Sequence, residues 1–236
     1  KQAKKEKLPT INCQPIIPTT EIIKPLLKEH GICILENYYP DESIDELIDE
    51  CKRLFAQQKD NIEILDAEDC SNDERIFHAQ KYSNLIRDKF ANEPLFDSLA
   101  RCYNPNLNKK TLINRLTHEE GMVKNSGAGW HRDNHHCQFK SIMYLSDVTE
   151  HNGNFQWVTN SSQSFIGLPT PREPGGRTTR FHDHVVQEII ASNPRCALHN
   201  IIGKKGTIIL ADTTYIHRGR IIDKGERLAL TQYYFT

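Results

Sequence analysis

The segment KGTIILADTTYIHRGR, residues 205–220, joins a short apolar run to a histidine. A glycine precedes the run and polar residues follow Asp212, so residues 205–212 are predicted to form a buried β-strand that ends in a turn. His217 follows this strand within a few residues. The segment therefore predicts a β-rich core that presents a histidine near a strand end.

Other segments of the second half repeat this strand-like character, with turns of Gly, Asn and Asp between them. The predicted strands are 111–120, 139–148, 153–160 and 227–236. Between them, 169–180 is predicted to be a loop and 183–193 a short helix.

The first half is predicted to be mainly helical. Residues 30–39 resemble a strand, and 40–58 form a helix, because its apolar residues fall on one face. Residues 81–104 are predicted to form one or two short helices broken near 92–94, whereas 59–80 give no clear pattern. The apolar face of the 40–58 helix consists of Ile44, Leu47, Ile48, Cys51, Leu54 and Phe55.

This order of elements predicts an α+β, mainly β fold: a β-sandwich or open barrel buttressed by N-terminal helices. We expect a single domain over 11–236, helical to about 105 and with its β core over about 111–236. No linker divides it. Residues 1–10 are predicted to be a solvated basic tail.

Composition limits the function classes. The net charge of −1 and the lack of a basic strip studded with aromatic residues argue against a nucleic-acid-binding protein. No apolar run is long enough to cross a membrane. Seven dispersed cysteines without a CxxC pair indicate reduced thiols and predict a cytoplasmic protein. The chain opens on Lys1 rather than methionine, so we take its natural N-terminus to be missing, and the sequence predicts no oligomeric state.

The stretch GWHRDNHH, residues 129–136, holds the densest group of metal-ligating side chains. In an extended segment His131 and Asp133 point to the same face, so an imidazole and a carboxylate can bind one ion. A third ligand must come from elsewhere, and His217 is the best candidate. Two histidines and one carboxylate leave about three positions open on an octahedral ion, which suits Fe(II).

Arg227 opens the last strand, ten residues after His217. If Arg227 faces inward, Ala229, Thr231, Tyr233 and Phe235 share its face. No acid is evident on that face, and a guanidinium matches a carboxylate. A dicarboxylate ligand is therefore predicted.

These motifs carry a family resemblance. WHRD, FKSIMYLSDVTEHNGNFQWV and GTIILADTTYIHRGR followed by ERLALTQYYF resemble the Fe(II)/2-oxoglutarate-dependent oxygenases, in particular their phytanoyl-CoA hydroxylase-like branch. The resemblance implies a double-stranded β-helix, the cupin-like jelly-roll. It implies His131, Asp133 and His217 as iron ligands, Arg227 on the distal carboxylate of 2-oxoglutarate, and O₂ as the second cosubstrate.

The resemblance also suggests finer contacts. Asn114 or Arg115, and Tyr144, stand where the family often contacts the cosubstrate. We expect substrate contacts from Trp130, which could equally be a packed aromatic, and from Asn134. Arg180 belongs to a loop that could close over an anionic substrate.

The predicted activity is hydroxylation of an unactivated C–H bond in a small polar or anionic molecule, with release of succinate and CO₂. Desaturation or ring chemistry, and a glycan or other macromolecular substrate, remain alternatives within the class. A rival from another class is a non-catalytic jelly-roll that keeps a metal. A nucleic-acid demethylase is disfavoured by the charge.

Overall fold

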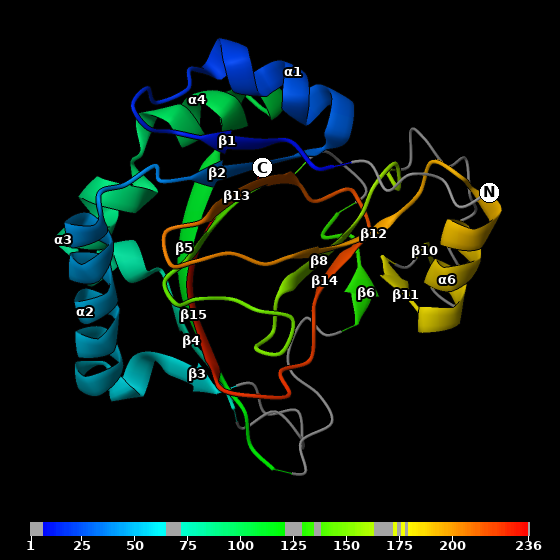
Figure 1. The fold of residues 1–236 in the computed structure, drawn as a ribbon. Helices are drawn as coiled ribbons and strands as arrows, with labels where there is room; N and C mark the ends of the chain where they lie inside the picture. Colours follow the sequence, from blue (N-terminus) through cyan, green and yellow to red (C-terminus); the bar gives the residue numbers. More distant parts are fainter. Residues whose placement is uncertain are drawn as a thin grey trace.

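Two β-sheets face each other and form the core of the protein, as a computed structural model shows (Figure 1). The structure describes residues 7–64, 72–120, 129–134, 138–162, 172–173, 176–177 and 179–235. Together the two sheets form the jelly-roll expected from the sequence, with helices packed outside it.

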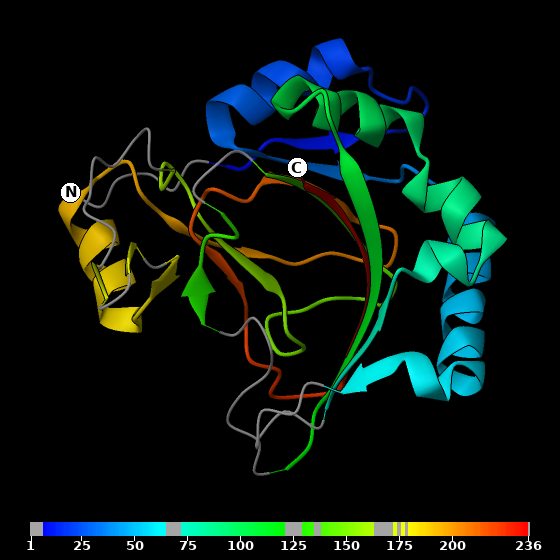
Figure 2. The same cartoon turned by 180° about the vertical axis from the view of Figure 1, so that it is seen from behind.

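The larger sheet has the strand order β1-β2-β13-β7-β15-β5-β4-β3. Its longest strands are the antiparallel pair β5 and β15, the two curved strands that run side by side in Figure 2. The strands are β1 Thr10–Asn12, β2 Ile32–Glu36, β3 Ile62–Ile64, β4 Asp73–Phe77, β5 Asn108–Thr117, β7 Phe139–Tyr144, β13 Ile208–Asp212 and β15 Glu226–Phe235.

The smaller sheet has the order β11-β6-β14-β8-β12. Its strands are short: β6 Trp130–His131, β8 Phe155–Val158, β11 Arg180–Phe181, β12 Leu198–Ile201 and β14 His217–Gly219. A separate ribbon pairs β9 Arg172–Glu173 with β10 Gly176–Arg177.

The N-terminal helices lie outside the larger sheet, and α6 lies beyond the smaller one (Figures 1 and 2). The helical elements are α1 Thr20–His30, α2 Asp41–Gln57, η1 Lys59–Asn61, η2 Ala79–Lys81, α3 Asn84–Ile86, η3 Arg87–Ala91, α4 Pro94–Tyr103 and α6 Asp183–Ser192. The expected break near 92–94 separates η3 from α4, and the buried face of α2 is the predicted one apart from the half-buried Ile48.

Strand alternation divides the side chains of the larger sheet between two environments. On β15, Leu228, Leu230 and Tyr234 pack in the cluster that the helices cover. Ala229 instead packs in the interior cluster with Trp157 of the smaller sheet. Arg227 shares the face of Ala229, so the predicted inward face of β15 is the one turned to the interior.

The turn between α1 and β2 helps to place the segment that leads to His217. Gly31 ends α1 with φ +72, a conformation that favours glycine, and its N–H donates to the Leu27 carbonyl. A Cβ at Gly31 would overlap the ring of Tyr215, and that ring stacks on Trp157 at 4.9 Å. The α1 cap and the interior aromatic pair therefore fix the backbone two residues before His217.

Elements that were not predicted include α1, η1, η2, β1, β3, β4, β12 and β14. Residues 169–180 were expected to be a loop. Their described part instead contains the short strands β9 and β10 and the first residue of β11. Within the described part of the chain, no helix combines the length and the apolar character that a membrane crossing requires.

Candidate metal centre

The smaller sheet brings the three predicted ligands together at one end of the interior. His131 on β6 and His217 on β14 are direct cross-strand partners, so their side chains share a face. Asp133 Oδ1 lies 3.6 Å from Nε2 of His131 and 3.6 Å from Nε2 of His217. One ligand atom from each residue lies within 4.8 Å of the other two, close enough to bind a single ion.

Both imidazoles are oriented by backbone carbonyls. His131 Nδ1 lies 2.8 Å from the Gly129 carbonyl, and His217 Nδ1 lies 2.8 Å from the Tyr215 carbonyl. An Nδ1–H that donates to each carbonyl leaves Nε2 as the lone-pair nitrogen, turned toward Asp133. His217 Nε2 is buried and has no hydrogen-bond partner among the described residues, so a metal ion would satisfy it.

Burial and the neighbouring charges favour, in His217 and Asp133, the protonation states that metal binding requires. Burial lowers the pKa of His217 to about 4, so its imidazole is neutral near pH 7. Burial alone would raise the pKa of Asp133, but Lys140 and the two histidines hold it well below its usual range. Neutral imidazoles and an ionised carboxylate are the forms that ligate a divalent ion.

Lys140 on β7 is a buried cation beside the ligand carboxylate. Its Nζ lies 2.6 Å from Asp133 Oδ2 and 4.4 Å from the centre of the Tyr233 ring. Burial lowers the pKa of Lys140, but the Asp133 carboxylate outweighs this effect, and the pKa is raised overall. The two oxygens of Asp133 therefore have different neighbours: Oδ1 faces the histidines and Oδ2 faces an ammonium.

Arg227 lies on the interior face of β15. Its Nη1 donates to the Gly153 carbonyl, and its Nη2 donates to Asn114 Oδ1 at 2.6 Å. Its Nε is buried, and no hydrogen-bond partner for it occurs in the part of the chain that the structure describes. Burial lowers the pKa of Arg227, although a guanidinium keeps its charge at neutral pH. A buried cation with an unused donor matches the carboxylate of a ligand.

Asn114 and Tyr144 also reach the interior, but their polar atoms are bonded to protein. Asn114 Nδ2 donates to Asp73 Oδ1 at 2.6 Å, and its Oδ1 accepts from Arg227. The Tyr144 hydroxyl donates to the Ile201 carbonyl at 2.9 Å and accepts from the Phe155 N–H. Both residues thus shape the wall around Arg227.

Arg115, the alternative to Asn114, faces the helices. It pairs with Glu74 Oε2 at 2.5 Å, and its guanidinium lies 4.3 Å from the centre of the Phe55 ring. Strand alternation therefore separates these two neighbours and leaves Asn114 as the one on the interior side.

The residues suggested for substrate binding occupy different faces. Trp130 packs with Val158 and Phe181 in the cluster behind the smaller sheet, and Arg218 lies 4.2 Å above its ring. Arg180 is exposed and is the cross-strand partner of His131, so the two share a face. Asn134 is also exposed, immediately after Asp133.

Several sequence positions lie outside the described residues. They include His135, His136 and Cys137 of the histidine-rich stretch, and 163–171 together with 174–175 and 178 from the region of the arginine-bearing loop.

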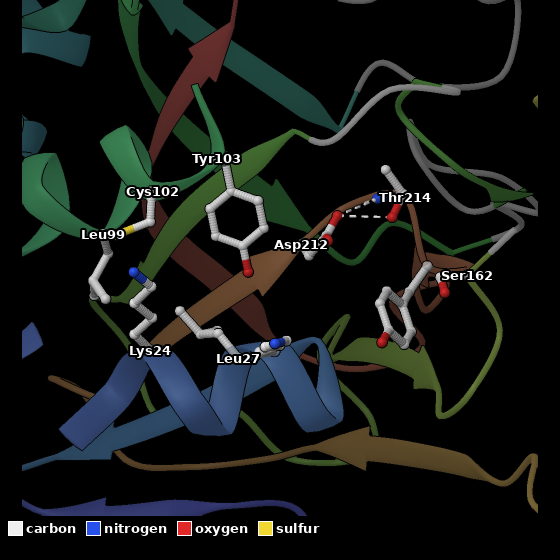
Figure 3. A pocket seen from close by; sticks show the side chains of 10 residues that line it. Lys24, Leu27, Leu99, Cys102, Tyr103, Ser162, Asp212 and Thr214 are labelled. Atoms are coloured by element: carbon white, nitrogen blue, oxygen red, sulfur yellow. Dashed lines mark hydrogen bonds between the residues drawn. The ribbon is translucent and has the colours of Figure 1, made fainter. Parts of the chain in front are cut away.

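A cavity of about 420 Å³ lies between α1, α4 and the segment after β13 (Figure 3). Leu27, Leu99 and Tyr103 contribute apolar surface, and Lys24 approaches from α1. Asp212 Oδ1 accepts from the Thr214 N–H at 3.1 Å and from its hydroxyl at 2.8 Å. None of the three metal-site residues lines this cavity.

Sequence reasoning missed Asp73, Arg75 and Lys140. Asp73 and Arg75 form an ion pair on β4, 3.0 Å between Oδ1 and Nε, in a region without a clear pattern. Lys140 could have been found, because alternation along FKSIMY places it on the same face as Tyr144.

The jelly-roll, with two histidines and one carboxylate close enough to bind one ion, defines the class of Fe(II)- and 2-oxoglutarate-dependent oxygenases. The chain belongs to the phytanoyl-CoA dioxygenase (PhyH) family, whose model matches residues 27–220. The match confirms the family resemblance and the predicted dioxygenase class. No curated protein matches the chain.

Solved structures share the fold at low identity. The epimerase SnoN in complex with Fe3+, alpha ketoglutarate and nogalamycin RO is 15% identical, with a TM-score of 0.68 over 92% of this chain and 83% of that one. EctD from S. alaskensis with 2-oxoglutarate and 5-hydroxyectoine is 19% identical, with a TM-score of 0.62 over 88% and 73%. HygX from Streptomyces hygroscopicus with nickel, 2-oxoglutarate and hygromycin B is 13% identical, with a TM-score of 0.55 over 89% and 85%. The jelly-roll prediction is thereby confirmed.

Proposed function

We propose that this protein uses Fe(II), 2-oxoglutarate and O₂ to hydroxylate an unactivated C–H bond of a small polar or anionic substrate. His131, Asp133 and His217 would hold the iron. The observation that carries the proposal is the convergence of three ligand atoms, one of them the orphaned His217 Nε2, in an interior that also contains the Arg227 guanidinium.

The chain's own residues would prepare the site for this chemistry. Iron bound there with 2-oxoglutarate would couple oxidative decarboxylation to oxidation of the substrate, with release of succinate and CO₂. The carbonyls of Gly129 and Tyr215 keep the imidazoles in the ligating tautomer. Arg227 would bind the distal carboxylate of 2-oxoglutarate, and Asn114 and Gly153 would hold the guanidinium in place.

The aromatic wall would exclude water from the reacting groups. Phe155 lies 5.3 Å from the His217 ring, and Trp157 lies 6.3 Å from it, measured between ring centres. Both side chains are buried in the interior cluster. An apolar wall beside the metal ligands strengthens electrostatic interactions and protects the reaction from solvent.

The position of Arg180 supports the proposal of an anionic substrate. It is exposed on the strand beside His131 and faces the same side, so a substrate that approaches the metal would pass its guanidinium. Asn134 is a second exposed candidate next to the ligand Asp133. Trp130 contacts the opposite side of the smaller sheet and is left out of the proposed substrate site.

The test is succinate formation by the purified protein supplied with Fe(II) and 2-oxoglutarate, while candidate metabolites that bear a carboxylate or phosphate are added in turn. A suitable substrate accelerates succinate release, and the wild-type protein shows the weak visible charge-transfer band of an anaerobic Fe(II)–2-oxoglutarate complex. Absence of both signals would support the non-catalytic jelly-roll instead. Analysis of the product distinguishes hydroxylation from desaturation or ring chemistry.

A further inference from the structure

We infer that Lys140 is a positioning residue that keeps Asp133 a single-oxygen ligand of the metal. The inference rests on the proposed function, because it assigns a role to Lys140 only if His131, Asp133 and His217 bind the metal. It gives a reason for the buried ammonium of Lys140, which metal binding by two histidines and one aspartate does not by itself require.

The geometry divides the carboxylate between two partners. Asp133 Oδ1 lies 3.6 Å from each histidine Nε2, whereas Oδ2 lies 2.6 Å from Lys140 Nζ. An ion placed among Oδ1 and the two Nε2 atoms would leave Oδ2 paired with Lys140. A carboxylate that rotated to use both oxygens would have to break this ion pair.

Lys140 itself has little freedom to move. Its side chain is 9% exposed, and its ammonium lies 4.4 Å from the centre of the Tyr233 ring. The backbone around it pairs with strands on both sides, with Tyr233 on β15 and with Ala211 on β13. A cation fixed at the centre of a sheet can hold the orientation of a loop carboxylate.

The backbone of Asp133 is held as well. Its N–H donates to the Thr213 carbonyl at 3.0 Å, and the Thr213 N–H donates to the Gln138 carbonyl at 2.7 Å. With the main chain fixed in this way, rotation of the carboxylate is the freedom that remains, and Lys140 restrains it.

The number of ligand oxygens decides how many positions remain for small molecules. An octahedral ion with two imidazoles and one carboxylate oxygen keeps about three open positions. Two of them suit the keto acid chelate, and one suits O₂. A second oxygen from Asp133 would take that last position. Lys140 thereby preserves the capacity of the site to accept both cosubstrates.

Stability alone does not account for this ion pair. A buried ion pair costs desolvation and often adds little to stability compared with apolar residues of similar volume. Removing only the ammonium would leave the Asp133 carboxylate uncompensated and free to interact more fully with a metal. The loss of Lys140 should therefore not weaken metal binding, although it should impair turnover.

The test compares Lys140→Met with Lys110→Met. Lys110 also lies near the Tyr233 ring, at 5.6 Å, and its ammonium is 4.7 Å from the centre of the Phe77 ring. The control thus removes a neighbouring cation whose ring contacts are with Phe77 and Tyr233, whereas the described cation paired with Asp133 is Lys140. The readouts are the crystal structure of each protein with Ni(II) and 2-oxoglutarate, the Kd for Ni(II), and succinate release at matched iron occupancy.

We expect Oδ1-only coordination in the wild type and in Lys110→Met, and coordination through both oxygens in Lys140→Met. Succinate release by Lys140→Met should fall about 10- to 100-fold with no weakening of Ni(II) binding. Lys140→Arg keeps a positive charge, so Asp133 should bind the metal through one oxygen, as in the wild type. Unchanged coordination of Asp133 in Lys140→Met would overturn the inference.

Two further outcomes remain decisive. If Lys140→Met does not fold, the wild-type complex supplies the test, because an Oδ2 atom that leaves Lys140 when Ni(II) binds would also overturn the inference. If the wild type binds no metal at the three ligands, the proposed function itself fails. That result is distinct from a metal-loaded wild type in which Lys140 has no influence.

Discussion

The replacement Arg227→Met tests the part of the site that selects 2-oxoglutarate. Methionine keeps much of the side-chain volume and removes the guanidinium, whose Nη atoms donate to Gly153 and Asn114 and whose Nε is unused. Each hydrogen bond to a charged group contributes roughly 1.5–3 kcal/mol. Two such bonds to a carboxylate amount to about 3 kcal/mol or more, which corresponds to an increase in KM for 2-oxoglutarate of about a hundredfold or more.

The assay is succinate release as a function of 2-oxoglutarate concentration, with the Kd for Ni(II) measured in parallel. Arg227→Lys should give an intermediate KM, because an ammonium keeps the charge and loses the planar fork. Arg115→Met is the matched control: it removes an arginine from the opposite face of the same sheet, where the partners are Glu74 and Phe55. A wild-type KM in Arg227→Met, or an equal increase in Arg115→Met, would refute the assignment.

Three other changes follow from the same contacts. His131→Ala or Asp133→Ala should abolish iron-dependent 2-oxoglutarate turnover, and wild-type turnover in either purified protein would contradict the metal site. Asn114→Ala should raise the KM for 2-oxoglutarate about tenfold, because Arg227 loses an orienting acceptor worth about 1.4 kcal/mol, while the Kd for Ni(II) stays constant. Asp212→Asn should raise the melting temperature at neutral pH. Burial raises the pKa of Asp212 in the folded protein, so the protonated carboxyl stabilises the fold below about pH 4, and this stabilisation is lost as the carboxyl ionises at higher pH. The melting temperatures of the wild type and of Asp212→Asn should therefore converge as the pH falls to about 4.

The alternation of side chains along the strands was enough to predict most of the core. Alternation in 227–236 assigns Arg227 and Ala229 to one face, and the interior cluster contains Ala229 as expected. The two-residue spacing of His131 and Asp133 led to the prediction that they share one ion, although β6 ends at His131 and Asp133 lies in the bend that follows. Local patterns of this kind predict which face of a strand a residue lies on, even when the partner strand is unknown.

Pairing between distant strands could not be predicted in the same way. Asp73 approaches Asn114 because β4 pairs with β5, and nothing in the polar stretch 59–80 specifies that register. Helix α1 was missed although Gly31 provides a recognisable C-terminal signal. The face of Lys140 is evident from its strand, but its partner Asp133 lies after β6, on a different strand pair, and the sequence does not specify that these two residues meet.

The charges that face the interior bear on the substrate. The described cations that face inward from the larger sheet include Arg75, Lys140 and Arg227, while Asp73 and Asp133 supply carboxylates. A divalent ion adds two positive charges, and 2-oxoglutarate brings two negative ones. Counted over these described side chains, the loaded interior keeps an excess of positive charge, which favours anionic over cationic guests. For this reason, carboxylate- and phosphate-bearing metabolites should accelerate succinate release more than their neutral counterparts of the same size, and the difference should shrink as salt is added.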